Sequence, residues 1–274
     1  MNLDWRDRIG EVNYFVSGNF SFVKNEVTKF RGDVSSISGT NMILEGYPIN
    51  IQYVLEVDRI IQTDEDMAYV QSLVDKNPQY FATYTRPVKG DFLYKDTNGD
   101  GSLTPDDRVI KGWGLNPQIT YGMSFGADWK GIDFSVLLQG VARWKTYYQD
   151  NSYSFMTRHG FSINKTIAEG RWVEGRTDAK FPRFLNNVDA RNMQPSDAFI
   201  FNKSFLRVKN IQVGYMLPKN ISRTVLMDNV RVYVSIDNAY TFKNKDFPGI
   251  DPELNAGILY PTLKNYSFGL NLTF

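Results

Sequence analysis

Apolar and polar residues alternate one by one along several segments of the chain, most clearly at its C-terminus. Every second residue there is apolar and shares one face: Tyr266, Phe268, Leu270, Leu272 and Phe274. The same period of two runs through residues 119–129 and 230–237, and through residues 12–22 with Phe15 as an exception. Because successive side chains of a β-strand point to opposite sides of the sheet, this pattern predicts strands with one apolar face.

Less regular alternation predicts three further strands, for about seven in all: residues 47–61, 132–148 and 200–217. In the last of these the apolar face changes phase near Lys209 and Asn210, and a β-bulge would explain the change. A tight turn containing Gly131 is expected to join two strands.

Residues 62–116 and 150–199 are polar and rich in Gly, Pro, Asn and Arg. We expect long loops there, with a short helix near residues 64–74. Alternation alone leaves two architectures open. The apolar faces could pack into the core of a soluble β-sandwich or contact lipid in a transmembrane β-barrel. The polar faces use Gly, Ser, Thr and Asn more than Lys and Glu, which favours the hydrated interior of a barrel.

Composition and the length of the apolar runs exclude several classes of protein. The 274 residues include 31 basic and 30 acidic side chains, so no excess charge favours nucleic acid, and no nucleic-acid partner is expected. There is no cysteine, which excludes disulfides and thiolate metal sites. The apolar runs are far shorter than the ~20 residues that a membrane-spanning helix needs.

Residues 91–112 contain a loop with the ligand spacing of an EF-hand. The D-x-N-x-D-G pattern carries Gly101 at its sixth position, and its candidate cation ligands are Asp96, Asn98, Asp100, Ser102 and Asp107. Odd-numbered positions of such a loop point at one hard cation, and Ser102 would contribute its backbone carbonyl. We expect structural Ca²⁺ here, with Mg²⁺ as the alternative.

Two features separate this loop from a calcium sensor. The twelfth position is Asp107 in place of the longer glutamate, and the preceding residues 86–91 do not favour a helix. Calcium-driven opening of a helix pair is therefore not expected, and the affinity should fall in the weak extracellular class of about 10⁻⁴ to 10⁻³ M. A turn that is merely rich in Asn, Asp and Gly is the other interpretation.

Several segments in series resemble the C-terminal part of SusC/RagA-type TonB-linked outer membrane transporters. They read GDFLYKDTNGDGSLTPDDRVIKGWGLNPQITYGMSF, FLRVKNIQVGYMLP, NVRVYVSIDNAYTF, GIDPE and YPTLKNYSFGLNLTF. The resemblance runs from about residue 5 to the end of the chain, which finishes on an aromatic residue as such barrels commonly do.

This resemblance implies an all-β fold, the C-terminal part of an antiparallel barrel of roughly 22 strands closed by a plug, with long extracellular loops. It implies a place in the outer membrane and a role in importing nutrients such as glycans or peptides. The implied partners are a SusD-like surface lipoprotein that acts as a lid, TonB, and the lipid bilayer. The loop at 91–112 would then be an extracellular clamp.

A complete member of that family also has a plug, a TonB-contacting segment and many more strands than are visible here. An open sheet of about seven strands would leave unpaired edges in hydrocarbon, where each unsatisfied backbone group costs several kcal/mol. We therefore expect residues 1–274 to be the C-terminal segment of a transporter whose remainder is a necessary partner.

No enzyme is expected. The single histidine, His159, lies in a polar loop, and the adjacent acids Asp106 and Asp107 cannot flank a glycosidic bond as two separated carboxylates do. The alternatives to a transporter are a soluble calcium-stabilised β-rich binding module and, less well supported, a secreted glycan hydrolase.

Aromatic residues in the predicted loops have two interpretations, stacking on sugars or a structural role in an aromatic girdle or in loop packing, and the structural role is favoured. The residues concerned are Trp113, Trp144, Trp172, Tyr147 and Tyr148. Arginines make the loop at 150–199 basic, which would favour an acidic ligand or lid protein: Arg158, Arg171, Arg176 and Arg183.

Overall fold

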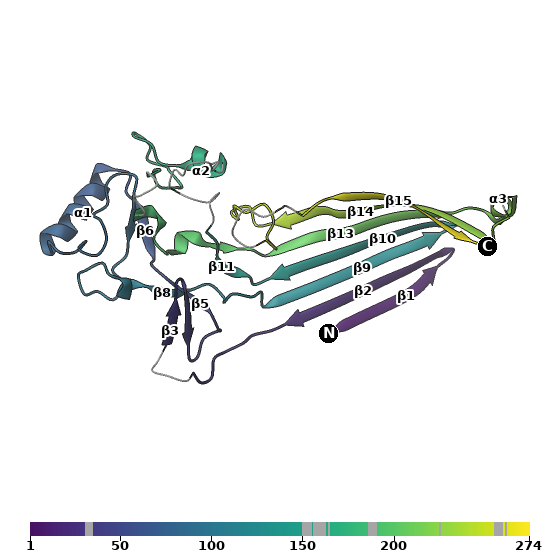
Figure 1. Cartoon of the computed structure of the whole chain (residues 1–274), viewed down its shortest axis with the longest axis horizontal. Coiled ribbons are helices and arrows are strands. Elements are labelled where there is room, and N and C mark those ends of the chain that lie inside the picture. The colour runs from purple at the N-terminus through teal and green to yellow at the C-terminus, as the bar shows by residue number, and fades with distance from the viewer. Residues whose placement is uncertain are drawn as a thin grey trace.

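A computed structural model describes residues 1–30, 35–149, 155, 163, 165–185, 191–224, 226–254, 260 and 262–274. Its largest element is a single antiparallel sheet of seven long strands (Figure 1). In spatial order the strands are β1 (Asn2–Ile9), β2 (Val12–Phe22), β9 (Ile119–Trp129), β10 (Ile132–Ala142), β13 (Phe205–Met216), β14 (Asn229–Lys243) and β15 (Asn265–Thr273). Antiparallel strands that follow one another in the chain lie side by side, which is the topology of a meander.

The membership of this sheet differs from the prediction at two places. Strand β1 was not predicted, because charged residues at both faces obscure its alternation, yet it pairs with β2 along its whole length. Residues 47–61 were wrongly assigned to the sheet. They form the short strands β5 (Ile51–Val54), which is mostly buried, and β6 (Val57–Ile60), which is partly exposed, and the two strands belong to separate small sheets.

The predicted turn and bulge are both present. Lys130 and Gly131 have positive φ angles of 49° and 87°, so they form a two-residue connection between β9 and β10. A Cβ at Gly131 would lie 2.9 Å from the carbonyl oxygen of Met216, so space as well as conformation favours glycine. The register of β13 against both its neighbours shifts between Val208 and Asn210, which leaves Lys209 as the bulged residue.

The apolar face of the sheet is exposed. Tyr266 is 66% exposed, Phe268 is 85% exposed and Leu270 is 57% exposed, and residues of the same face on β1, β9, β13 and β14 are exposed as well. The opposite face carries polar pairs between strands, such as the contact of 2.6 Å between Arg231 Nη2 and Asp133 Oδ1. In the part of the chain that the structure describes, no second sheet covers the apolar face, so a β-sandwich does not account for it.

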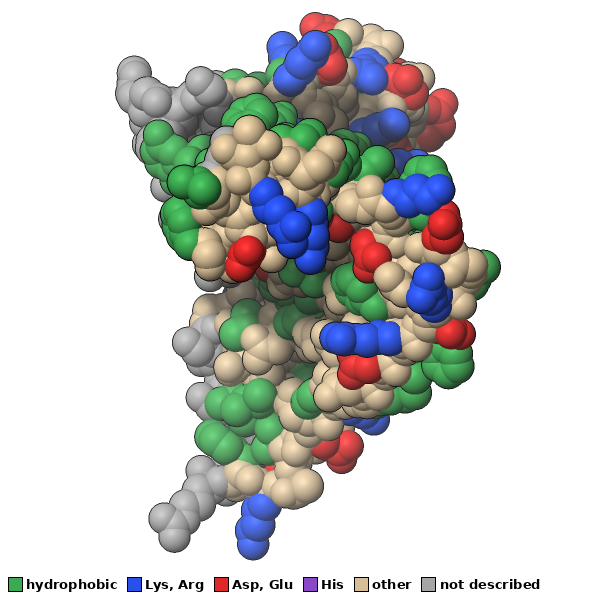
Figure 2. Space-filling model, turned by 90° about the vertical axis from the view of Figure 1, so that its right-hand side faces the viewer, with side chains coloured by type: hydrophobic (Ala, Val, Ile, Leu, Met, Phe, Trp, Pro, Cys, Tyr) green, Lys and Arg blue, Asp and Glu red, His purple; other side chains and the backbone are tan. Residues whose placement is uncertain are grey.

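Short connections lie at one end of the sheet and long ones at the other (Figure 1). The short-turn end carries the tight turns and α3 (Lys219–Thr224), and Figure 2 shows basic and acidic side chains interspersed when the molecule is viewed from that end. Among the described residues, no helix is long and apolar enough to cross a membrane.

The long connections fold into a lobe with its own core, which we call the loop lobe. Besides β5 and β6 it contains β3 (Ser35–Ser38), β4 (Asn41–Leu44), β7 (Phe92–Tyr94), β8 (Val109–Lys111), β11 (Lys145–Tyr147), β12 (Ile200–Asn202), α1 (Asp64–Lys76) and α2 (Lys165–Gly170). Its described residues also include short 3₁₀ turns at Pro105–Asp107, Arg191–Met193 and Asp197–Phe199. Its core is largely aromatic and includes Tyr80, Phe92, Tyr94, Phe155 and Phe199. Among the described residues, the segments predicted as polar loops therefore supply about half of the buried apolar side chains.

Candidate functional site

The acidic loop follows β7 and closes on itself through its own backbone. Oδ1 of Asp96 accepts a hydrogen bond from the Gly99 N–H at 2.7 Å, and Oδ2 accepts one from the Gly101 N–H at 2.8 Å. Both glycines have positive φ angles, 75° and 81°, which glycine adopts without strain. The two glycines therefore allow Asp96 to organise the turn.

Asn98, Asp100 and Ser102 continue the same pattern on the exposed rim of the loop. The Asp100 N–H donates to Asn98 Oδ1 at 2.9 Å, and the Ser102 N–H donates to Asp100 Oδ1 at 2.8 Å. Asn98 Nδ2 also donates to Asp100 Oδ2 at 3.1 Å. The structure thus places Asp96, Asn98 and Asp100 in one tight turn, with acceptor oxygens near one another.

Asp107 has a different environment, because its side chain is fully buried below the loop. Its Oδ1 accepts from the Thr97 N–H at 2.8 Å and its Oδ2 accepts from the Thr104 N–H at 2.8 Å. Thr104 in turn caps the 3₁₀ turn at Pro105–Asp107. In this conformation Asp107 holds the two ends of the loop together.

The donor set of the loop fits a hard cation, since carboxylate and amide oxygens are the ligands that Ca²⁺ prefers. The described residues nevertheless contain no group of three or more acidic, histidine or cysteine side chains assembled to hold a metal ion. Like Asp107, Asp96 accepts backbone hydrogen bonds through both of its carboxylate oxygens, so both side chains would have to release or share backbone bonds to bind an ion. Cation binding by this loop stays a prediction.

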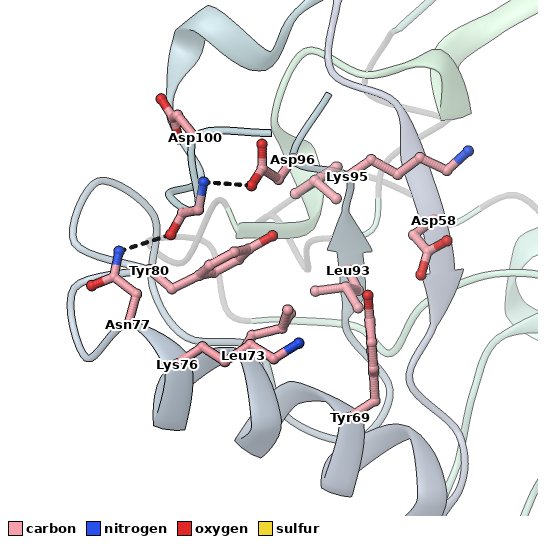
Figure 3. A pocket seen from close by; sticks show the side chains of 12 residues that line it. Asp58, Tyr69, Leu73, Lys76, Asn77, Tyr80, Leu93, Lys95, Asp96 and Asp100 are labelled. Atoms are coloured by element: carbon pink, nitrogen blue, oxygen red, sulfur yellow. Dashed lines mark hydrogen bonds between the residues drawn. The ribbon is translucent and has the colours of Figure 1, made fainter. Parts of the chain in front are cut away.

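A pocket of about 610 Å³ adjoins the loop (Figure 3). Helix α1 supplies Tyr69, Leu73 and Lys76 to one wall, and the acidic loop supplies the other. Asn77, the residue that ends α1, donates from Nδ2 to the Gly101 carbonyl oxygen at 2.7 Å. This bond fixes the loop against the helix, so the pocket has a defined shape.

The pocket combines aromatic rings with charges of both signs. Tyr80 lines the pocket, and burial and the nearby carboxylate of Asp96 raise the pKa of its phenol to about 12. The phenol is therefore neutral at physiological pH and can donate or accept a hydrogen bond. Asp58 and Lys95 line the opposite side of the pocket. Such a lining is suited to binding a polar ligand.

The fold is shared with solved transporters. The RagAB peptide importer in its open-open state aligns over all of this chain with a TM-score of 0.71 and 23% identity, covering 28% of the importer chain. The closed-closed state of the RagAB peptide importer gives a TM-score of 0.74 at 22% identity and covers 29% of that chain. No protein-family model matches the chain.

Sequence comparison gives the same relationship. The TonB-dependent receptor SusC of Bacteroides thetaiotaomicron is 26% identical over 269 residues, which cover 94% of this chain and 24% of the receptor. TonB-dependent receptor P26 of Formosa agariphila is 27% identical over 202 residues, which cover 68% of this chain and 20% of the receptor. The chain is homologous to SusC/RagA-type TonB-dependent receptors. It spans about a quarter of the length of these relatives or less.

The homology to SusC/RagA receptors confirms the resemblance predicted from sequence motifs. These relatives are named as receptors and importers, not as enzymes. The acids that could have formed a glycosidase pair agree with this, because Asp106 is exposed on the loop while its neighbour Asp107 is buried beneath it. His159 lies outside the described residues.

The loop aromatics of this SusC/RagA homologue mostly pack within the protein, as favoured from the sequence. Tyr148 is buried in the core of the loop lobe, and Tyr147 packs against that core. Trp144 donates from its indole nitrogen to the Leu115 carbonyl oxygen at 2.9 Å. Trp172 lies so close to Gly90 that any Cβ there would overlap its ring. Only Trp113, 39% exposed, has a large accessible surface among these five residues.

Two buried charge clusters were missed by sequence reasoning. One joins the quoted segments FLRVKN and GIDPE, where Arg207 Nη2 lies 2.5 Å from Asp251 Oδ1 and Arg207 also binds Glu253. The other surrounds Asp91, which forms ion pairs with Arg183 and Arg191. The only signal in the sequence was an arginine or aspartate beside apolar strand residues. Such a residue suggests a buried charge, but the sequence does not indicate which residue pairs with it.

Proposed function

We propose that this chain forms the C-terminal strands of an outer-membrane, TonB-dependent nutrient importer. The observation that carries the proposal is the exposed apolar face of the seven-stranded sheet, opposite a face of polar pairs. In water such a face would be costly, at about 25 cal/mol for each Å² of apolar surface. In contact with lipid the same face does not carry this cost, because the surrounding acyl chains are apolar as well.

The edges of the sheet support a larger barrel. Among the described residues, β1 and β15 each pair with one neighbour, so the outer edge of each strand has a row of backbone groups without a strand partner there. Backbone groups without partners cannot be exposed to hydrocarbon. We propose that strands from the remainder of the transporter pair with both edges and close a barrel of about 22 strands around a plug.

The loop lobe then lies on the extracellular side. We propose that it contacts a SusD-like lipoprotein lid, that energy comes through TonB, and that the acidic loop binds structural Ca²⁺ and stiffens the lobe. RagAB is a peptide importer, and SusC is a TonB-dependent receptor. Peptides are the cargo favoured by the structural relatives, and glycans are the second candidate.

Membrane contact can be tested with the native tryptophans. Trp5 and Trp129 are 56% and 47% exposed, whereas Trp144 lies in the loop lobe with its indole bound. Lipids brominated on their acyl chains should quench the fluorescence of variants that retain only Trp5 or Trp129, and should leave a variant that retains only Trp144 bright. Equal quenching of all three, or a compact monomer without detergent, would contradict the proposal.

Import can be tested in cells. A strain lacking this chain should lose uptake of labelled peptides or glycans and regain it when the gene is restored. Uptake that is unchanged for both cargo classes would exclude the import function while leaving the membrane placement intact.

A further inference from the structure

A second pocket, of about 670 Å³, lies between α2 and the end of β14. It is separate from the acidic loop and shares no lining residue with the pocket of Figure 3. Its charged lining comprises four basic and two acidic side chains: Arg176, Lys180, Lys243, Lys245, Glu169 and Asp246. The sequence had indicated a basic character for part of this region, and the structure places it around a cavity.

Two of the basic groups are available to a ligand. The ammonium groups of Lys180 and Lys245 have no ion-pair partner in the part of the chain that the structure describes, and both side chains are exposed. Both lysines line the pocket although they come from distant parts of the chain. A carboxylate between them would form charge-assisted hydrogen bonds, which are roughly twice as strong as neutral ones.

The remaining charges of the lining are two basic and two acidic side chains, so they balance one another and leave the positive charge of this pair: Arg176, Lys243, Glu169 and Asp246. Arg176 is anchored by its own contacts, with Nη1 donating to the Glu169 carbonyl oxygen at 2.7 Å and Nε bonding to Asp178 at 2.8 Å. The Glu169 carboxylate lies 3.7 Å from Lys165, to which it is ion-paired. Lys243 donates to a neutral acceptor, the Gly249 carbonyl oxygen, so its positive charge remains.

Apolar rings form the rest of the lining, from Phe181, Phe201 and Phe247. Phe247 is only 3% exposed and packs edge-on against Tyr148 with centroids 5.0 Å apart. Phe181 and Phe201 are partly buried, so they supply the apolar surface that a ligand can reach. Acidic side chains beside apolar ones match both the charges and the rings.

We infer that this pocket binds acidic peptides, with side-chain carboxylates held by Lys180 and Lys245 and an adjacent apolar side chain against the phenylalanines. Binding of acidic peptides in this pocket would serve the proposed import function. That the bound peptide is imported cargo rests on that proposed function. The affinity should fall as salt is raised, because exposed charges are screened.

The test uses the protein isolated from its native membrane in detergent, with its associated polypeptides retained. The probes are Ac-Glu-Phe-Glu-NH₂ and its neutral match Ac-Gln-Phe-Gln-NH₂, titrated by calorimetry. The acidic peptide should bind at least about tenfold more tightly, a difference that two charge-assisted contacts can supply. The double variant K180Q/K245Q should lose that preference, and K24Q/K29Q, with two exposed lysines changed elsewhere, should keep it.

Equal affinity for the two peptides, or an unchanged preference in K180Q/K245Q, would overturn the inference. Tighter binding of trigalacturonate than of the acidic peptide would overturn the assignment to peptides. Failure of the proposed import function would give a different result. Cells lacking the chain would then take up all cargo normally, while the purified protein would still bind the acidic peptide more tightly than the neutral one.

Discussion

Arg183 and Asp91, 92 residues apart in the chain, form a two-point ion pair in the loop lobe. Nε of Arg183 lies 2.7 Å from Asp91 Oδ1, and Nη2 lies 3.2 Å from Oδ2. Asp91 is fully buried and is also contacted by Arg191 at 3.2 Å and by Asn192 at 3.1 Å. This cluster ties the segment before β7 to the segment that follows α2, so the two long connections fold as one unit.

Asp91→Ala should destabilise the loop lobe strongly. The substitution leaves two arginines partly buried without their carboxylate, and breaking a buried pair in this way typically costs about 3–5 kcal/mol. Hydrogen exchange should show faster exchange throughout β6 and β7, while exchange in the seven-stranded sheet stays unchanged. Asp64→Ala is the matched control, because Asp64 pairs with Lys89 at the surface and its side chain is 90% exposed. Equal exchange in the two variants would contradict the structural role of Asp91.

Gly269→Ala should destabilise the sheet, because the ring of Tyr233 on the neighbouring strand lies over Gly269 and a Cβ would overlap it. Overpacking of this kind costs typically about 1–3 kcal/mol. Urea unfolding in detergent would measure the loss. Gly18→Ala is the control, since the nearest atom to a Cβ there is a carbonyl oxygen at 3.8 Å, an ordinary contact.

A double-mutant cycle separates steric overlap from loss of backbone freedom. If overlap is the cause, Gly269→Ala should cost much less in a Tyr233→Ala background, in which the ring has been removed. An equal cost in both backgrounds would exclude the ring as the cause.

Lys203 should make stability depend on pH. It is 2% exposed, donates to the Leu254 carbonyl oxygen at 3.1 Å, and lies 4.1 Å from the ring centroid of Trp144. Burial lowers the pKa of Lys203 from 10.5 to about 8, and the negative charge of Asp251 offsets part of that effect. Between these two values the unfolded chain binds more protons than the folded chain, so the free energy of unfolding should rise with pH.

The slope contributed by one group is at most about 1.4 kcal/mol per pH unit. Urea unfolding measured from pH 8 upward should show this rise in the unaltered protein and a smaller slope in Lys203→Met. Lys165→Met, at an exposed position of α2, should retain the slope. An identical slope in the protein and in Lys203→Met would show that Lys203 titrates normally.

Calcium should bind to the acidic loop with an affinity of about 10⁻⁴ to 10⁻³ M, the range of extracellular sites. Calorimetry should give heat with the unaltered protein and none with Asp100→Ala. Asp106→Ala changes an exposed acid of the same loop that is not a predicted ligand, so its heat should match that of the unaltered protein. Equal heats from Asp100→Ala and the unaltered protein would exclude cation binding by the acidic loop.

Chelation gives an independent measurement. Removal of Ca²⁺ should increase proteolysis within residues 96–102, because the ion would tie together side chains that otherwise hold only their own backbone. Proteolysis that is indifferent to Ca²⁺ would show that hydrogen bonds from Gly99 and Gly101 to Asp96 suffice to order the turn.

Local features of the sheet were predictable because each is encoded by neighbouring residues. The bulge at Lys209 follows from a change of phase in one strand, and the turn at Gly131 follows from a tight connection between two strands. Strand β1 was missed because its charged residues interrupt the alternation. Residues 47–61 were misplaced because Ile51, Val54 and Leu55 are as apolar as strand residues of the sheet, although they are buried in the loop lobe.

The order of residues alone is enough to predict strands with one apolar side and a tight acidic turn, since both depend on spacing within a few positions. It does not reveal that the polar connections form a lobe around an aromatic core, or that Arg183 is the partner of Asp91. Those contacts join segments far apart in the chain, and many alternative pairings share the same local pattern. Only the folded structure selects among these pairings. A buried charged group needs an oppositely charged or hydrogen-bonding partner, and the fold brings one set of partners within reach.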